Sequence, residues 1–328
     1  MPKRLVKNIF PKIPNKIDTL YLDVETVSGN VNRGATLPYM GDRICGVAFT
    51  YDDCNSAWYM PVRHKPNDSL FGEDVGNIEL SKVVDFIQSL IDRSKQWVNH
   101  NIKFDAHFLS VEGIEINTTL VDTLTLAKLV DMQSKNYGYG LKPLAKAWCG
   151  IEADEQGVIK AELKSRRTKD YGDVPADIMG EYACADVIMN RALWKEIQKR
   201  KYEGIDNVWE LEIELTKTLF NIEKRGIVVD TEAMAMARET SSALATFVTK
   251  VLELPVISVT DKGSISMNSE AVHGYMELED VVADKKLSRF FYLINKYRER
   301  SQFVNLYAEG WLSYIDEDER MYPMYRQT

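Results

Sequence analysis

Hydrophobic and polar residues alternate at positions 19–26 (TLYLDVET), and strict alternation predicts a strand with two unlike faces. The apolar side chains of one face are Leu20, Leu22 and Val24. The other face carries Tyr21, Asp23 and Glu25. Acidic residues are poor strand formers, so two carboxylates on one strand face need a reason. From this strand alone, a solvent-exposed polar face and a functional site are both open interpretations.

Similar patterns predict the elements that follow this strand. Residues 43–51 and 57–62 form two further strands joined by a turn-rich segment, which indicates a hairpin. After residue 78 the hydrophobic period changes, and helices alternate with strands. We expect helices over 78–91, 104–111, 122–130 and 141–148, and strands at 96–98 and 119–121. Three strands followed by alternating helix and strand predict an α/β fold, a mixed sheet flanked by helices.

The second half of the chain has a helical pattern. Helices are predicted over 177–200, 208–225, 231–252 and 284–314. The helix over 208–225 is strongly amphipathic and is followed by Gly226, a residue suited to a C-terminal cap. The change of character after Arg200 predicts two domains, 1–203 and 204–328.

One polar segment, residues 152–174, separates the short helix from the long one. Its basic residues are Lys160, Lys164, Arg166, Arg167 and Lys169. We expect a solvated loop here, and a strip of phosphate contacts is the alternative interpretation.

The charge, the apolar runs and the cysteines of the chain limit the classes of protein to which it can belong. The chain has 328 residues, 41 Lys and Arg against 49 Asp and Glu, and a formal net charge of −8. An acidic balance does not by itself indicate nucleic-acid binding, so phosphate contacts would need basic patches, bound cations or a partner. No apolar run approaches 20 residues, so no membrane-spanning helix is expected, and the basic N-terminus lacks the apolar core of a secretory signal. The four cysteines form no CxxC pair and predict reduced, buried thiols in a cytoplasmic protein.

Four carboxylates are candidates for one site: Asp23, Glu25, Asp105 and Asp186. Asp105 falls in the first turn of a predicted helix, and Tyr182 stands one helical turn before Asp186. Clustered carboxylates repel one another, and Mg²⁺ or Mn²⁺, which prefer oxygen ligands, relieve that repulsion. Two such ions about 3.5–4 Å apart can activate a water and stabilise the leaving oxygen of a phosphodiester. Bound cations also let an acidic site accept phosphate. As an isolated pair, Tyr182 and Asp186 would more simply be a packed phenol near a polar rim.

Three short motifs, in this order along the chain, resemble the motifs of the DEDD 3′–5′ exonuclease superfamily. They are Asp23-x-Glu25, Asn101-x-x-Phe104-Asp105 and Tyr182-x-x-x-Asp186. The resemblance implies a ribonuclease H-like fold. One branch of the superfamily carries His where this chain has Glu181, so the chain resembles the tyrosine branch. Asp122-Thr123 and the segment at 140–145 (GLKPLA) also fit the superfamily.

The second half of the chain is similar to family A DNA polymerases, of phage type. Residues 210–230 resemble the segment that opens the polymerase region, and 297–298 and 321–328 resemble the later thumb and the approach to the palm. The chain thus looks like an exonuclease domain with the start of a helical polymerase thumb. The motifs of the palm and fingers are absent from the sequence. We therefore expect a second polypeptide that carries palm and fingers, and no nucleotide addition by this chain alone.

The resemblance assigns roles to residues. Asp23, Glu25 and Asp186 would hold one Mg²⁺ or Mn²⁺, and Asp23 would hold a second one together with Asp105 through water. Tyr182 would position the attacking water. The residues that would contact the terminal nucleotides are Thr26, Asn101 and Phe104. The implied substrates are the 3′ end of single-stranded DNA and primer-template DNA, in the cytoplasm or, for a phage protein, in the host cytoplasm.

Two other classes of function remain as alternatives. One is a free-standing exoribonuclease of the ribonuclease D type, which would carry a different helical domain at 210–230. The other is a non-catalytic scaffold module of a polymerase, which the retention of all four carboxylates disfavours.

Overall fold

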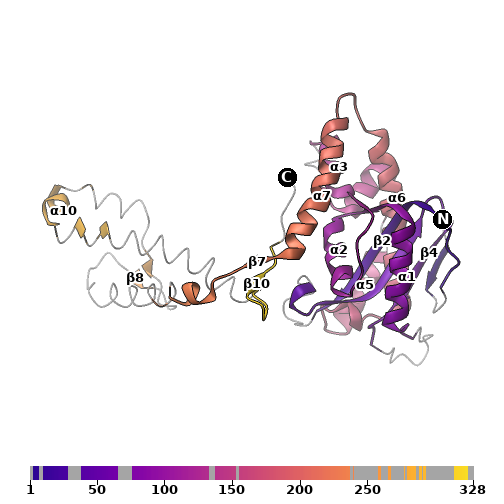
Figure 1. Cartoon of the computed structure of the whole chain (residues 1–328), viewed down its shortest axis with the longest axis horizontal. Helices are drawn as coiled ribbons and strands as arrows, with labels where there is room; N and C mark the ends of the chain where they lie inside the picture. The colour runs from indigo at the N-terminus through magenta and orange to yellow at the C-terminus, as the bar shows by residue number, and fades with distance from the viewer. Residues whose placement is uncertain are drawn as a thin grey trace. The chain divides into compact units, whose positions relative to one another are not determined.

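A six-stranded mixed sheet organises the first part of the chain (Figure 1). In the computed structural model, the strand order is β1-β4-β3-β2-β5-β6. The strands are β1 Lys3–Val6, β2 Ile17–Val27, β3 Arg43–Tyr51, β4 Ser56–Pro61, β5 Ser94–Asn99 and β6 Thr119–Asp122. β2, β3 and β4 pair antiparallel, whereas β5 and β6 run parallel to β2, and β1 runs parallel to β4. The predicted strands and the mixed α/β sheet are confirmed, and β1 is an additional strand.

The structure describes residues 3–6 (backbone), 10–28, 38–65, 76–132, 137–152 and 155–236, and short stretches between 239 and 323. The helices of the first part are α1 Leu80–Arg93, α2 Ile102–Val111, α3 Thr123–Val130, α4 Leu141–Leu144, α5 Glu155–Ser165, α6 Ala176–Lys199 and α7 Asp206–Arg225. α4 continues into a π-helical turn, η3 Ala145–Cys149, and two short 3₁₀ turns occupy η1 Pro38–Met40 and η4 Tyr171–Asp173.

Helices cover both faces of the sheet, and each face has its own hydrophobic core (Figure 1). Leu20, Leu22 and Val24 of β2 pack in the core that α1 and α2 cover. Tyr21 packs in the other core, which α6 dominates with residues such as Ala183. The predicted alternation of β2 is therefore confirmed, and it directs Asp23 and Glu25 toward the α6 side of the sheet.

The prediction of a loop over 152–174 is wrong, because α5 occupies Glu155–Ser165. Ile159 is buried, and Leu163, one turn later, is partly buried against the same core as α6. Two apolar side chains four residues apart suffice here, because α6 already provides a packed surface for them. The basic residues that suggested a loop lie exposed on and just after this helix.

The contacts of the chain define two compact units, 1–225 with 324–328, and 226–323. α7 therefore groups with the sheet, although the sequence placed it in a second domain that starts at residue 204. α7 packs in both hydrophobic cores, through Phe220 in one and Trp209 in the other, and a buried polar network also joins it to α2. Glu223 of α7, which is fully buried, accepts from Lys103 Nζ at 2.5 Å and pairs with His107 Nε2 at 2.8 Å. The functional division at residue 203 stays a prediction.

The second unit is described only in short stretches. β7 Ile227–Val228 pairs antiparallel with β10 Arg320–Met321, β8 Ser258–Val259 pairs with β9 Ile265–Ser266, and α10 covers Glu279–Ala283. Gly226 has a φ of +68°, as expected for a glycine that ends a helix. Residues 231–236 are helical, as predicted, but most of the helices predicted over 231–252 and 284–314 lies outside the described residues.

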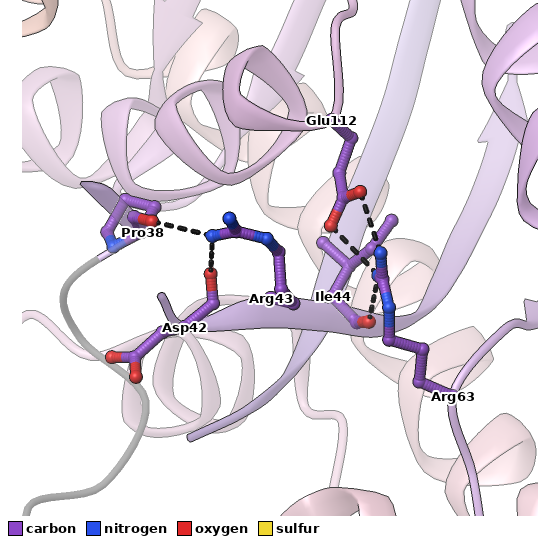
Figure 2. A network of polar contacts seen from close by, with 6 residues as sticks. All are labelled: Pro38, Asp42, Arg43, Ile44, Arg63 and Glu112. Carbon is purple, nitrogen blue, oxygen red and sulfur yellow. Dashed lines mark hydrogen bonds and ion pairs between the residues drawn. The ribbon is translucent and has the colours of Figure 1, made fainter. Parts of the chain in front are cut away.

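An arginine clamps the C-terminal end of α2 to the sheet (Figure 2). Arg63 donates from both terminal nitrogens to the two oxygens of Glu112, each at 2.8 Å, and also to the carbonyl of Ile44. Such a bidentate pair fixes geometry as well as contributing energy. Beside it, Arg43 donates to the carbonyls of Pro38 and Asp42, which holds η1 against β3.

None of the described helices is both long and apolar enough to cross a membrane. The four cysteines are free thiols, two of them buried, Cys45 and Cys184.

Candidate active site

The site begins on β2, where Asp23 and Glu25 point to the same face. Opposite them, β3 is irregular, since the register shifts between Glu25 and Thr26. Such bulges bend a strand and redirect its side chains, and they are frequent beside active sites. Gly46 of β3 pairs with Glu25, and a Cβ at this glycine would lie 2.0 Å from the hydroxyl of Tyr59. A side chain at this position would therefore require Tyr59 to move.

Asp105 reaches the site from the first turn of α2. Its Oδ1 accepts the backbone N–H of Val24 at 2.9 Å, and its Oδ2 accepts from Asn99 Nδ2 at 2.8 Å. The same Asn99 nitrogen donates to Asp23 Oδ1 at 3.0 Å. One amide at the end of β5 therefore joins the carboxylate of β2 to that of α2. As predicted, Asp105 lies in the first turn of its helix.

Tyr182 and Asp186 reach the site from α6. Lys142 of α4 joins them, because its Nζ donates to the Tyr182 hydroxyl at 2.7 Å and to Asp186 Oδ2 at 3.0 Å. Asn190, one turn further along α6, donates to the carbonyl of Val98 and accepts from the hydroxyl of Thr123. These contacts fix α6 against the ends of β5 and β6, so the position of the last carboxylate is set by the sheet.

Electrostatics shows that the carboxylates share one region. Burial raises the pKa of Glu25 well above its usual range, and the charges of Asp23 and Asp186 raise it further. Burial, followed by the charge of Asp23, raises the pKa of Asp105 in the same way. Burial raises the pKa of Asp186 to about 7, an effect that the nearby Lys142 opposes. Perturbed groups of this kind gather at functional sites because such sites place like charges close together.

The donor set suits a hard divalent cation by its chemistry. All four candidate side chains offer carboxylate oxygens, the ligands that Mg²⁺ and Mn²⁺ prefer. Asp186 Oδ1 is buried and has no hydrogen-bond partner among the described residues. Buried polar atoms of this kind need a partner, and a bound cation supplies one. No ready-formed cage of three histidine, cysteine or acidic side chains occurs within the described ranges.

The residues predicted to contact substrate lie around the same end of the sheet. Thr26 of β2 follows the register shift between β2 and β3 and is partly buried. Asn101 is exposed and caps α2 with a left-handed backbone, φ +62°, while its N–H binds Asp122 Oδ1. Phe104 is partly buried and packs against Phe108 at 4.8 Å between ring centroids. Thr26, Asn101 and Phe104 remain predicted substrate contacts.

Two residues of the site were not singled out from the sequence. Asn99 directly follows the strand predicted over 96–98, and an amide at such an end is a usable signal when the first turn of the next helix carries an acid. Lys142 belongs to the segment at 140–145, whose resemblance was noted without a role for the lysine. Only the fold brings this lysine to Tyr182, 40 residues further along the chain.

A family model for the 3′–5′ exonuclease of DNA polymerase A type matches residues 7–201. DNA polymerase DpoZ of Acinetobacter phage SH-Ab 15497 is 31% identical over 188 residues, which are 53% of this chain and 29% of that protein. DNA polymerase I of Synechocystis sp. is 22% identical over 255 residues, 72% of this chain and 22% of that protein. The chain spans less than a third of the length of these curated relatives.

A solved structure shares the fold. It is the POL domain of Pol1 from M. smegmatis in complex with DNA primer-template and dNTP, with a TM-score of 0.57 and 16% identity, over 94% of this chain and 49% of that one. The ribonuclease H-like mixed sheet and the helical segment after it agree with this likeness. Since the exonuclease model matches more than half of the chain, the protein belongs to the 3′–5′ exonuclease family of the DNA polymerase A type.

Proposed function

We propose that this chain is the proofreading 3′–5′ exonuclease part of a family A DNA polymerase. It hydrolyses the 3′-terminal phosphodiester of single-stranded or frayed DNA and releases nucleoside monophosphates. The observation that carries the proposal is the convergence of Asp23, Glu25, Asp105 and Asp186 beside Tyr182, within the range that the exonuclease family matches.

The proposed metal ligands follow from the donors present. Asp23, Glu25 and Asp186 would hold one divalent cation, and Asp23 and Asp105 would hold a second one through water. Two such ions, when bound, would lower the pKa of a water so that it loses a proton and becomes the nucleophile, and would stabilise the charge on the leaving 3′ oxygen. The protein supplies the geometry. Asn99 keeps two of the carboxylates together by its hydrogen bonds, so the ligands are oriented before any ion arrives.

Tyr182 has the proposed task of holding the attacking water. Its phenol is partly buried, and burial, together with the charges of Asp186 and Glu25, raises its pKa far above the usual value. The hydroxyl therefore keeps its proton at neutral pH. It can donate a hydrogen bond to the water, but it does not act as a base.

Thr26, Asn101 and Phe104 are proposed to contact the terminal nucleotides. A ring face that stacks on a base tolerates every base, so discrimination among sequences is expected to be weak. Paired ends must first lose their pairing and stacking, which costs a few kcal/mol. Mispaired and frayed ends are therefore cleaved faster than paired ends.

The first experiment measures cleavage of 5′-labelled DNA by the full chain in Mg²⁺, Mn²⁺ or EDTA. Asp23→Ala and Asp186→Ala should abolish cleavage while circular dichroism stays unchanged. Glu196→Gln, an acid near the far end of α6, is the matched control and should cleave normally. Activity in either alanine variant at saturating metal would contradict the assignment of the site. Faster cleavage of a matched RNA strand would favour the ribonuclease D-type alternative.

We also propose that palm and fingers reside on a second polypeptide. The relatives are more than three times as long as the matched part of this chain. Within the first unit, α7 exposes apolar side chains, Val208, Leu211 and Ile222, at 43%, 59% and 45%. An obligate interface that replaces a covalent domain junction should bury more than about 2,000 Å².

Co-expression with the downstream reading frame, size-exclusion chromatography and primer extension test the second polypeptide. The complex should elute as one species and extend a primer, whereas this chain alone should add no nucleotides. If the downstream product does not bind and this chain is a stable monomer, the chain is a self-sufficient exonuclease.

A further inference from the structure

A lysine stands among the carboxylates of the proposed metal site. Lys142 Nζ lies 2.7 Å from the Tyr182 hydroxyl, 3.0 Å from Asp186 Oδ2 and 3.8 Å from the centre of the Tyr182 ring. Its side chain is 15% exposed, and that of Asp186 is 11% exposed. This ammonium group thus makes a largely buried ion pair, a hydrogen bond and a cation–π contact at once.

The backbone that carries Lys142 is held firmly against α6. α4 runs directly into η3, and Ala145 of η3 packs in a small apolar cluster with Ala185 and Met189 of α6. The lysine and its two partners are therefore attached to elements that pack against each other. Such an arrangement restricts where the ammonium group can move and keeps it beside Tyr182 and Asp186.

The charge of Lys142 also reaches beyond its direct partners. Asp23 and Glu25, as well as Asp186, lie near enough to feel the positive charge of Lys142. Four acidic side chains in one buried region repel each other, and a single cation among them offsets part of this repulsion. The ammonium group thus does part of what a divalent ion does for these carboxylates.

From this geometry, and resting on the exonuclease function proposed above, we infer that Lys142 is a positioning residue with two opposing effects. It holds the Tyr182 hydroxyl in place for the attacking water, and it competes with the divalent cation for Asp186 Oδ2. The first effect favours cleavage, and the second weakens metal binding. A lysine that merely supported the fold would favour both.

The test separates these effects in the full-length chain. Mn²⁺ binding is measured without DNA from the electron paramagnetic resonance signal of free Mn²⁺, and cleavage is measured in single turnovers at saturating Mn²⁺. For Lys142→Met, we expect Mn²⁺ to bind roughly tenfold more tightly, the scale on which a neighbouring charge shifts a carboxylate equilibrium. Cleavage should slow roughly 10- to 100-fold, as for residues that orient a metal site from outside it.

Lys146→Met is the matched control. Lys146 lies one turn after Lys142, is 66% exposed and pairs at the surface with Glu152, so its loss removes the same charge without touching the site. Both measurements should stay within about twofold of wild type. Lys142→Arg, which keeps the charge, should retain wild-type Mn²⁺ affinity more closely than Lys142→Met does. Lys142→Gln serves for the comparison if the methionine variant does not fold.

Each result decides between the interpretations. Tighter Mn²⁺ binding together with slower cleavage supports the inference. Weaker binding together with slower cleavage, or no change in either, overturns it, as does an equal response of Lys146→Met. If the wild-type chain shows no metal-dependent cleavage, the proposed exonuclease function fails, while the Mn²⁺ titration still decides whether Lys142 competes for Asp186.

Discussion

Replacing Asp186 by Asn should stabilise the metal-free protein at pH 8 while abolishing its proposed activity. Asp186 is buried, and its pKa is raised to about 7 because burial disfavours its charge and Asp23 adds repulsion. At pH 8 the wild-type protein must keep this carboxylate ionised in a poor environment. An asparagine of nearly the same shape carries no charge and avoids that cost.

The magnitude follows from the pKa. A folded-state pKa of about 7 against an ordinary value of 3.8 corresponds to about 4 kcal/mol, at about 1.36 kcal/mol for each unit. Because the pKa of Asp186 is higher in the folded protein, the protonated carboxyl stabilises the folded state. This contribution is fully present below about pH 4 and is lost as the pH rises through about 7 and the group ionises. Asn also forfeits part of the contact with Lys142. We therefore expect a gain of about 2–4 kcal/mol at pH 8 and of at most about 1 kcal/mol at pH 4.5.

Urea unfolding in EDTA at both pH values measures this difference. Glu196→Gln changes a surface acid on the same helix and should alter the free energy of unfolding by less than about 1 kcal/mol at either pH. Added Mg²⁺ should raise the stability of the wild type more than that of Asp186→Asn, since a ligand stabilises the state that binds it. Equal stability of the two proteins in EDTA at pH 8 would refute the argument from repulsion.

Three further changes test other parts of the structure. Tyr182→Phe should slow cleavage roughly 10- to 100-fold, less than Asp23→Ala, since the ligands that activate water remain; complete loss would show that the phenol does more than position. Gly46→Ala should lower the free energy of unfolding by about 1–3 kcal/mol, because its Cβ would lie 2.0 Å from the Tyr59 hydroxyl; an unchanged urea midpoint would contradict this. Glu223→Gln should lower that free energy by about 3–5 kcal/mol, because it removes the carboxylate charge that pairs with the buried Lys103 of α2, and a loss below about 1 kcal/mol would count against the network.

Local pattern was enough to predict most of the fold. The alternation along β2 fixed both the strand and the side of the sheet that Asp23 and Glu25 face, since a period of two leaves only two choices. α5 could not be found in this way. The side chains that α5 contributes to the core are Ile159 and Leu163. They are enough to hold the helix because they pack on α6, which comes later in the chain.

The residues of the site also differ in whether a local pattern reveals them. The carboxylates and Tyr182 lie in three short motifs, each within one strand or one helix, and the resemblance of these motifs to a known superfamily predicted that they share a site. Asn99 and Lys142 act across the fold, through hydrogen bonds to residues 76 and 44 positions away in the sequence. No local period encodes such contacts, because the topology of the sheet and the packing of α4 on α6 create them.

The first compact unit includes α7 because the inner face of this helix is buried, although the sequence pattern suggested that a new domain begins before it. α7 has the amphipathic pattern of a new helical region, and its resemblance to a polymerase segment suggested a boundary before it. However, Glu223 on its inner face is fully buried and paired with Lys103 and His107, the residues two positions on either side of Asp105. A buried carboxylate without these partners would be strongly destabilising, so α7 and α2 depend on each other. Since α2 also delivers Asp105 to Val24, the helix that leads out of the nuclease unit helps to hold one of the proposed metal ligands in place.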